Sequence, residues 1–449
     1  MKLTFVNHAC CKIVAGRTGL LCDPWIDGPA FNYGWDLLVP TPLSIDEILD
    51  GVYFIWISHE HPDHFAPSFL ERAAQTHRDR ITILFQKTRD QRVANYCRKL
   101  GFRVQELADR VPTNLSADLR VTCGNFDFYD SWLHVSDGRQ SVLNLNDCIL
   151  RSAEDLQSVA EAVGQPTLLL TQFSYAAWKG GKANRDFRDE AARQKLMTLA
   201  AQVTVLKPAY TLPFASMVYF SNVENFYLND AVNTPRRAAE TLAAAGTMPV
   251  VMYPGDTWDI GTLVDNAASL ARYDLLYGTM DVLPRRDAGT SVDLAQLIAA
   301  FAQYHQRVFS RNARSLVWLL SQFPFLGAFQ PLVIRLDDID TLISLSLLDG
   351  LEIMPVNAPA PDVTMHSSSL LFILQNDFGY DTLTVNGRFE ATPTGFSKMT
   401  RSLAIGSLNA MGLSISPRLI FEWRLVLILL RRLKGVMNRL TRGPVAESA

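Results

Sequence analysis

The stretch WISHEHPDHF, residues 56–65, places three histidines, one glutamate and one aspartate within six consecutive positions. It overlaps the end of GVYFIWIS, residues 51–58, an almost unbroken apolar run typical of a strand buried on both faces. The chain has eight histidines in all, and three of them lie here. Imidazole and carboxylate groups are the usual protein ligands of zinc, iron and manganese. The stretch therefore predicts a metal-binding loop at the end of a buried strand.

The spacing of these side chains predicts two metal positions. In a short loop, His59 and His61 can turn towards one point, and Asp63 and His64 towards a second point nearby. Two metal ions held about 3.5–4 Å apart can share a water or oxygen species between them. A surface loop that is rich in histidine by chance is the alternative, but the apolar strand directly before it argues against this.

The composition is typical of a globular protein with a large core. The chain has 449 residues, 48% of them apolar and 19% charged, and a formal net charge of −3. The length suggests two or three domains, and the charge excludes the basic footprint of a nucleic-acid binder. The six cysteines form no CxxC pair, and Met1–Val14 has no signal-peptide pattern. We therefore expect a cytoplasmic protein whose cysteines are mainly buried thiols.

Short β-rich runs alternate with β–helix units up to about residue 265. We expect KLTFVNHACCKIVAG, residues 2–16, and TGLLCDPWIDG, residues 18–28, to form neighbouring strands. The pattern predicts a layered α/β domain over residues 1–265, with sheets inside and helices outside. Long helical and strand-like stretches follow, so residues 266–449 are predicted to form a smaller C-terminal α+β domain.

The segment LIFEWRLVLILLRRLKGVMNRL, residues 419–440, has leucines at helical spacing beside a basic face. A membrane-spanning helix needs about 20 mainly uncharged residues, so the charges exclude a span. The segment predicts a basic amphipathic helix, which either packs on the core or makes a peripheral contact with an anionic membrane surface.

The motif HxHxDH behind a buried strand, in a β-rich α/β chain, resembles the metallo-β-lactamase superfamily. Three further stretches narrow the resemblance: CDPWIDGPAFNYGWDLL at 22–38, LNLNDC at 143–148 and KPAYTLPFASM at 207–217. With them the chain looks like the metallo-β-lactamase-type portion of CMP-N-acetylneuraminate hydroxylase and its bacterial relatives. The likeness covers residues 1–265 and continues more weakly into MHSSSLLFILQNDFGYDTLTVNGRFE, residues 365–390. It implies a four-layer αββα sandwich.

The resemblance also implies a ligand set. It assigns the motif residues and a bridging aspartate at the end of a strand to the two metals: His59, His61, Asp63, His64 and Asp147. Asp63 and Asp147 take the catalytic roles, because they would orient the reactive oxygen and fix the separation of the metals.

The superfamily normally supplies one more histidine to each metal, and this chain departs from that pattern. CGNFDFYDSW, residues 123–132, and PFASMVYFSNVEN, residues 213–225, contain no histidine where one is expected. Asp127 and Glu224 are the candidate substitute ligands. A shift of register that brings in His134 and a coordination shell left open to water or substrate are the alternatives.

Other groups are expected around the metals without binding them. His8, in VNHACC, and Asp23, which ends LLCDP, are candidates to support the ligands or face the substrate. The loop TQFSYAAWKGGKANRDF, residues 171–187, matches a family loop that overhangs the metals. Its substrate-binding candidates are Tyr175, Trp178, Lys179 and Lys182.

The resemblance and the carboxylate-rich ligand set together indicate an O2-dependent diiron oxygenase, a hydroxylase of a small or sugar- or nucleotide-like metabolite. Iron is favoured, with zinc or manganese as alternatives. The related hydroxylases carry a Rieske [2Fe–2S] module, which needs paired cysteines and histidines that this sequence lacks. We therefore expect an external electron-donor protein. A metal-dependent hydrolase of a phosphodiester, ester or amide, possibly lipid-linked, is the second interpretation, and a non-catalytic scaffold is the third.

Overall fold

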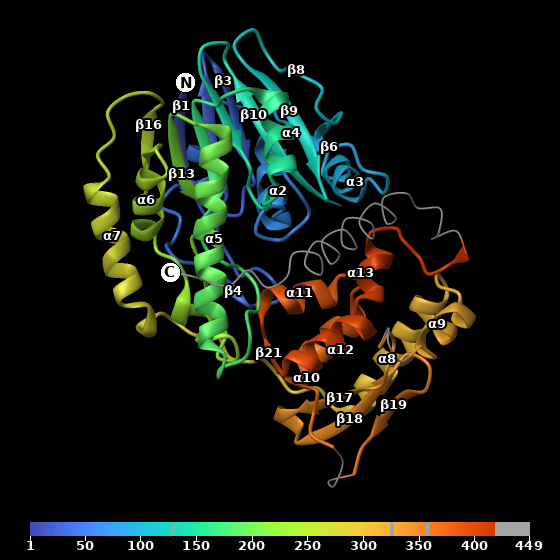
Figure 1. The fold of residues 1–449 in the computed structure, drawn as a ribbon. Coiled ribbons are helices and arrows are strands. Elements are labelled where there is room, and N and C mark those ends of the chain that lie inside the picture. The colour runs from blue at the N-terminus through green and yellow to red at the C-terminus, as the bar shows by residue number, and fades with distance from the viewer. Residues whose placement is uncertain (128, 324–326, 356–358, 418–449) are drawn as a thin grey trace. The chain divides into compact units, whose positions relative to one another are not determined.

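The computed structural model describes residues 1–127, 129–323, 327–355 and 359–417, and the chain divides into two compact units (Figure 1). The first unit contains Met1–Gly289 and Thr382–Glu390, and the second contains Thr290–Asp381 and the residues from Ala391 onward. This division lies later in the chain than the boundary at residue 265 expected from the sequence. The predicted amphipathic segment 419–440 lies outside the described residues.

The observed boundary lies beyond residue 265 because two further elements belong to the first unit. The helix α7 (Ala267–Gly278) and the 3-10 helix η2 (Met280–Val282) follow residue 265. Tyr273 and Met280, one from each element, are buried in the hydrophobic core of the first unit. A segment that buries such side chains cannot leave the unit without exposing them to water.

Two seven-stranded sheets form the first unit. In spatial order, the strands of the first sheet are β16 (Thr257–Asp259), β1 (Lys2–Asn7), β2 (Cys10–Ala15), β3 (Thr18–Cys22), β5 (Val52–Ile57), β6 (Thr82–Gln86) and β7 (Arg103–Leu107). Those of the second sheet are β15 (Met248–Pro249), β13 (Tyr210–Phe214), β12 (Leu168–Gln172), β11 (Ser141–Asn144), β10 (Asp130–Ser136), β9 (Arg120–Phe126) and β8 (Thr113–Asn114). The strands β4 (Trp35–Leu37) and β14 (Val218–Phe220) pair separately.

Each sheet has an antiparallel half and a parallel half, and helices join the parallel strands. The parallel strands are β3, β5, β6 and β7 in one sheet and β11, β12, β13 and β15 in the other. The helices of the first unit before α7 are α1 (Ile45–Leu49), α2 (Pro67–Thr76), α3 (Arg92–Lys99), α4 (Ala153–Val163), α5 (Arg185–Leu206), η1 (Phe226–Ala231) and α6 (Pro235–Ala244). Parallel pairing requires such crossovers, and α3 packs on the first sheet while α5 and α6 pack on the second.

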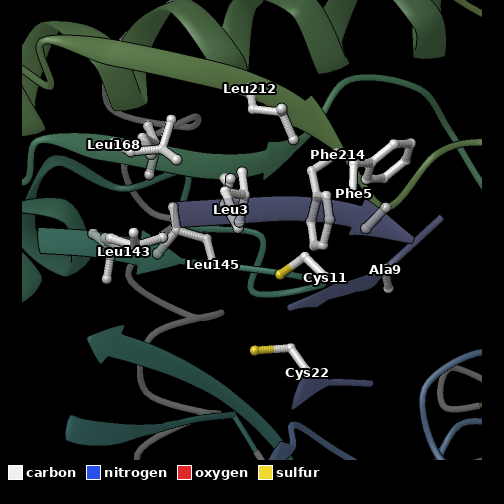
Figure 2. Packing of buried hydrophobic residues seen from close by; sticks show 14 of the residues in the cluster. Leu3, Phe5, Ala9, Cys11, Cys22, Leu143, Leu145, Leu168, Leu212 and Phe214 are labelled. Atoms are coloured by element: carbon white, nitrogen blue, oxygen red, sulfur yellow. The ribbon is translucent and has the colours of Figure 1, made fainter. Parts of the chain in front are cut away.

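The two sheets pack face to face around one hydrophobic core (Figure 2). Leu3 and Phe5 of β1 approach the second sheet, where the rings of Phe5 and Phe214 lie 6.1 Å apart in an edge-on arrangement. All six cysteines are buried and form no disulfide, as expected from their scattered positions. Sheets inside and helices outside confirm the predicted four-layer αββα architecture.

The first predicted strand is in fact two. KLTFVNHACCKIVAG splits into the antiparallel pair β1 and β2, with a tight turn at His8 and Ala9. His8 adopts a φ of +40°, and its backbone N–H donates to the side chain of Asn7 at 2.9 Å. The apolar pattern runs through the turn and hides it, because Ala9 and Cys10 are buried like the strand residues around them. The split moves His8 to the end of the hairpin.

The second unit is an α+β structure. Its strands follow the order β19 (Gly350–Ile353), β18 (Thr341–Ser346), β17 (Leu332–Leu336) and β20 (Val363–Met365), while β21 (Phe389–Ala391), the last strand of this sheet, has only Ala391 in the second unit. The helical elements from this part of the chain are α8 (Leu294–Phe309), α9 (Arg314–Ser321), η3 (Asp337–Ile339), α10 (Ser367–Gln375), α11 (Gly379–Asn386), α12 (Pro393–Leu403) and α13 (Ile405–Ala410). Among the helices in the described ranges, none has the length and apolar composition needed to cross a lipid bilayer.

Candidate metal centre

Three loops of the first unit meet at one edge of the two sheets. Asp23 follows β3, residues 58–66 follow β5, and Asp147 follows β11. Because β3 and β5 are parallel, their carboxyl ends lie side by side. Polar groups gather at such strand ends, where the backbone leaves the sheet and side chains can converge. The metal-binding motif is therefore positioned by strands rather than by a free surface loop.

The first cluster contains His59, His61 and Asp147, whose ligand atoms all lie within 4.8 Å of one another. Nε2 of His59 lies 2.9 Å from Nδ1 of His61 and 3.8 Å from Oδ2 of Asp147. The other ring nitrogen of His59 contacts Oγ of Ser58 at 2.9 Å. This contact holds the ring with Nε2 towards the cluster, so the three side chains offer one nitrogen each from two imidazoles and one carboxylate oxygen.

The second cluster contains Asp63 and His64, with His8 beside them, and it lies on the other side of Asp147. Nε2 of His64 is 3.3 Å from Oδ2 of Asp63 and 3.3 Å from Oδ1 of Asp147. Asp147 thus turns one oxygen to each cluster, which is the geometry of a bridging carboxylate. Nε2 of His64 and Oδ1 of Asp63 are buried and have no hydrogen-bond partner. Buried polar atoms without partners are costly, and a metal ion at each cluster would satisfy them.

Asp23 fixes the orientation of His64 from beneath the loop. Its carboxylate accepts a hydrogen bond from Nδ1 of His64 at 3.0 Å, from the backbone N–H of Ser58 at 2.7 Å and from Nδ2 of Asn146 at 2.7 Å. Because a carboxylate only accepts, Nδ1 of His64 carries a proton, and Nε2 is the nitrogen that faces the cluster and can bind a metal ion in place of a second proton. Metal-binding histidines are commonly held by a carboxylate in this way.

His8 fixes the orientation of Asp63 through a hydrogen bond, as Asp23 does for His64. Nδ1 of His8 accepts a hydrogen bond from the backbone N–H of Met217 at 3.2 Å, so Nε2 carries the proton. Nε2 lies 3.2 Å from Oδ2 of Asp63 and donates to it. The tight turn between β1 and β2 places His8 here, 1% exposed. His8 therefore supports a ligand rather than facing the substrate.

The clusters hold opposite charges in close contact. Although burial lowers it, the carboxylates of Asp63, Asp147 and Asp23 raise the pKa of His64 well above its usual value. Burial and the positive charge of His64 lower the pKa of His59 well below its usual value. Against burial, which acts in the other direction, His64 also lowers the pKa of Asp147. A proton and a metal ion therefore compete for the same imidazole nitrogens and carboxylate oxygens of this centre.

The two substitute ligands expected from the sequence are not brought into either cluster. Asp127 lies exposed on the turn between β9 and β10, with a φ of +47°, and belongs to neither group of potential metal ligands among the described residues. Oε2 of Glu224 is instead bound by the guanidinium of Arg388, at 2.7 Å from Nε and 2.6 Å from Nη2. Arg388 is 3% exposed, so this ion pair is buried and Glu224 is not free to bind a metal.

Asp130 is the carboxylate that the sequence reasoning missed. Asp130 begins β10, and its carboxyl lies near enough to Asp147 for the two charges to interact. Burial and the negative charge of Asp147 raise the pKa of Asp130 to about 8. His134, further along β10, belongs to neither cluster, and burial lowers its pKa to about 4. Asp130 belongs to the strand and Asp127 to the turn before it, and the sequence pattern leaves this boundary open.

The loop 171–187 contributes to a cavity beside the centre. The cavity has a volume of about 250 Å³, and its lining includes Asp147, Tyr175 and Lys179. Trp178 turns away from it and stacks on Phe389, with ring centroids 4.9 Å apart. Lys182 does not line it either, because its ammonium lies over the ring of Tyr227 at 5.9 Å. Two of the four substrate-side candidates in this loop thus reach the cavity.

Two further basic residues line this cavity and carried no signal in the sequence. Arg151 follows the LNLNDC segment, and Lys195 lies in the middle of α5. Neither is part of a motif, and only the packing of α5 against the second sheet brings Lys195 to the same space.

Comparison with known proteins adds sequence relatives. No family model matches the chain. Cytidine monophosphate-N-acetylneuraminic acid hydroxylase from Xenopus laevis is 27% identical over 285 residues, which cover 59% of this chain and 46% of the relative. The enzyme of the same name from Danio rerio is 26% identical over 290 residues, covering 60% of this chain and 48% of the relative. The chain thus spans about half the length of the curated relatives it matches.

Solved structures with a similar fold are more distant. CmlA, a diiron β-hydroxylase from Streptomyces venezuelae, is 16% identical with a TM-score of 0.42, over 57% of this chain and 53% of CmlA. The metallo-β-lactamase fold protein YhfI from Bacillus subtilis is 13% identical with a TM-score of 0.39, over 57% of this chain and 98% of YhfI. The layers of the first unit and the metal-binding motif at the end of β5 make it a four-layer sandwich of the metallo-β-lactamase type. The sequence of the chain is similar to those of CMP-N-acetylneuraminic acid hydroxylases.

Proposed function

We propose that the protein is a dinuclear metalloenzyme that uses two iron ions to hydroxylate a small or sugar- or nucleotide-like metabolite with O2. The observation that carries the proposal is the convergence of His59, His61 and His64 on Asp147, whose two oxygens face the two clusters, with Asp63 in contact with His64. The buried Nε2 of His64, without a hydrogen-bond partner, supports a cation there.

The composition of the ligand set favours iron over zinc. His59, His61 and Asp147 form a set of two histidines and one carboxylate, which is typical of non-haem iron sites in oxygenases. Around His64 lie the carboxylates of Asp63 and Asp147, together with the imidazoles of His8 and His59. Oxygen ligands suit iron and manganese better than zinc, which is usually held by nitrogen and sulfur.

The residues of the chain prepare the centre in three ways. Asp147 offers one oxygen to each metal position and so fixes their separation. Asp23 and His8 keep His64 and Asp63 in the orientation that binding needs. His59, Asp63 and His64 are at most 3% exposed, which excludes bulk water from the ligands. When bound, the two iron ions would supply the activation of O2 for attack on a C–H bond.

The proposal extends to partners and compartment. Oxygenase chemistry of this kind consumes electrons, so we assign their delivery to a separate electron-donor protein. The six buried, unpaired thiols support a reducing compartment such as the cytoplasm. A peripheral membrane contact remains a proposal for residues 419–440, and no nucleic-acid partner is proposed.

Hydrolysis is the second candidate, and the histidine loop also favours it. Paired metals at His59, His61 and Asp63 would lower the pKa of a shared water, and Asp63 and Asp147 would orient the resulting hydroxide towards a phosphodiester, ester or amide. Zinc is the metal that hydrolysis would favour, so metal identity distinguishes the two candidates.

Elemental analysis of anaerobically purified protein tests the proposal. We expect about two iron ions per chain and a coloured protein. His61→Ala should lose metal and activity together. A colourless zinc protein that cleaves a chromogenic phosphodiester would replace the oxygenase with the hydrolase. A metal-free protein whose biological role survives His61→Ala would overturn both and leave a scaffold.

A further inference from the structure

The cavity beside Asp147 concentrates positive charge. Its lining includes Arg151, Lys179 and Lys195, which come from three separate segments of the first unit. The only carboxylates that line it are Asp147 and Glu190. Glu190 is already engaged, because both of its oxygens accept from Arg193 at 2.7 and 2.8 Å. Asp147 belongs to the metal centre, so the three cations have no dedicated counter-charge.

Two of the three cations, Arg151 and Lys179, also lack other partners among the described residues. No hydrogen bond or ion pair holds the guanidinium of Arg151 or the ammonium of Lys179 to any residue in the described ranges. Burial and the charge of Arg151 lower the pKa of Lys179. Burial lowers the pKa of Lys195 to about 8 despite the attraction of Asp147, and Arg151 and Lys179 lower it further. Lys179 and Lys195 are half-buried, and Arg151 is exposed at the mouth of the same lining. Like charges at half-buried positions destabilise the fold unless an anion offsets them.

Lys195 links the cavity to the bridging carboxylate. Its Nζ donates to Oε1 of Gln172 at 2.5 Å, and Nε2 of Gln172 donates to Oδ1 of Asp147. Because the ammonium can only donate, the amide of Gln172 has one orientation, with its N–H2 towards Asp147. A group bound by Lys195 therefore sits one side chain away from the metal centre.

We propose that Arg151, Lys179 and Lys195 form a subsite for an oxyanion, a carboxylate or phosphate group of the substrate. A volume of about 250 Å³ is smaller than the roughly 300–1,000 Å³ of whole-ligand pockets, so it holds the anionic end and not an entire cofactor-sized molecule. The subsite anchors this end and leaves the adjoining part of the substrate next to Asp147. This assignment of a substrate class rests on the proposed function.

Calorimetric titration with inorganic phosphate and with acetate tests the subsite. The protein is first treated with a chelator, so that an anion cannot bind by ligating metals and the result is independent of the proposed metal chemistry. We expect saturable binding of at least one of the two anions, and weakening by about tenfold or more in Lys179→Met and in Lys195→Met. Preference for phosphate or for acetate identifies which group the substrate carries.

Two further variants make the test specific. Lys182→Met removes the same charge from the same loop but not from the cavity, and should leave binding unchanged. Lys179→Arg keeps the charge and should retain binding, which separates loss of the site from misfolding. Absence of binding of both anions to the wild-type protein, or equal weakening by Lys182→Met, would overturn the subsite while leaving the metal centre intact.

Discussion

At the scale of single residues, the centre depends on carboxylates that bind no metal themselves. Asp23 is fully buried and joins the end of β3 to His64, Ser58 and Asn146. It holds its left-handed backbone conformation, with a φ of +43°, within this network. Asp23 therefore determines which nitrogen of His64 faces the metal position.

Asp23→Asn should weaken metal binding without removing a ligand. The amide cannot accept all three hydrogen bonds, so His64 loses its fixed tautomer and orientation. Loss of such a supporting group typically costs about 10–100-fold in metal affinity. Competition with a chromogenic chelator measures the change. Asp27→Asn is the matched control, because Asp27 pairs only with the exposed Arg72, and equal losses in both variants would contradict the role of Asp23.

Asp130→Asn tests the carboxyl that begins β10 beside Asp147. We expect metal content to fall from about two ions per chain, because a metal ion can displace the proton of this carboxyl and bind its oxygen, whereas the amide of asparagine gives no carboxylate. Asp127→Asn, three residues away on an exposed turn, should keep the wild-type content. Metal analysis after dialysis compares the two. The reverse result would return Asp127 to the ligand set and remove Asp130.

At the scale of elements, α5 places a lysine where its charge lowers the stability of the fold but can serve the binding of an anion. This 22-residue helix packs on the second sheet and presents Lys195 to the cavity in the middle of its length. A methionine there would pack equally well and would not need hydration. Charged groups that destabilise a fold commonly persist where function requires them.

Lys195→Met should stabilise the chelator-treated protein at pH 7. The pKa of Lys195 is about 8 in the folded chain and near 10.5 in the unfolded chain. Between these values the unfolded chain binds more protons, so wild-type stability rises with pH through this window. Below pH 8 the lysine costs about 1–3 kcal/mol, a range that allows for its partial exposure.

Urea unfolding at pH 7 and pH 10 measures this difference. We expect Lys195→Met to be more stable than wild type at pH 7 and to lose most of that advantage at pH 10. An advantage that stays constant with pH would indicate packing rather than charge. A destabilised variant at pH 7 would show that Lys195 is compensated in the fold.

At the scale of the whole molecule, the first unit is completed by a segment from far along the chain. Residues 382–390 return to it, and Asn386 and Arg388 donate to the backbone oxygens of Phe31 and Asn32 at 3.1 and 2.9 Å. Phe31, Asn32 and Tyr33 are all left-handed, with φ of +49°, +52° and +61°. A left-handed backbone conformation costs a residue other than glycine about 1–2 kcal/mol, so this turn is strained. The hydrogen bonds from the returning segment help to hold it.

This turn borders the metal centre. The ring of Phe31 packs edge-on against that of His61, with centroids 5.6 Å apart. The segment 382–390 therefore supports a ligand of the first cluster although it lies more than 300 residues away in sequence. The resemblance noted in residues 365–390 coincides with this structural role.

Arg388→Met should destabilise the first unit strongly. It leaves Glu224 in a largely buried site without its cation, and loss of one partner of a buried ion pair costs about 3–5 kcal/mol. The thermal unfolding midpoint measures the loss. Arg236→Met, in an exposed pair with Asp274, should lower the midpoint far less, because solvent screens this ion pair. Similar small losses in both would show that the returning segment is not needed for the unit.

The local sequence determined the metal-binding loop, because the apolar strand and HxHxDH lie within 15 residues and need no distant partner to be read. The roles of Asp23 and Asp147 entered through the resemblance to a family. The composition of the core and the alternation of strands and helices were enough to predict the layered α/β architecture.

The tertiary structure alone decided the rest. The place of Asp130 near Asp147 depends on where β10 begins, and the pairing of Glu224 with Arg388 depends on the segment 382–390 that returns to the first unit. The cavity gathers Arg151, Lys179 and Lys195 from separate elements. Such contacts arise from packing between residues distant in sequence, and the local periodicity of side chains carries no information about which distant residues will meet.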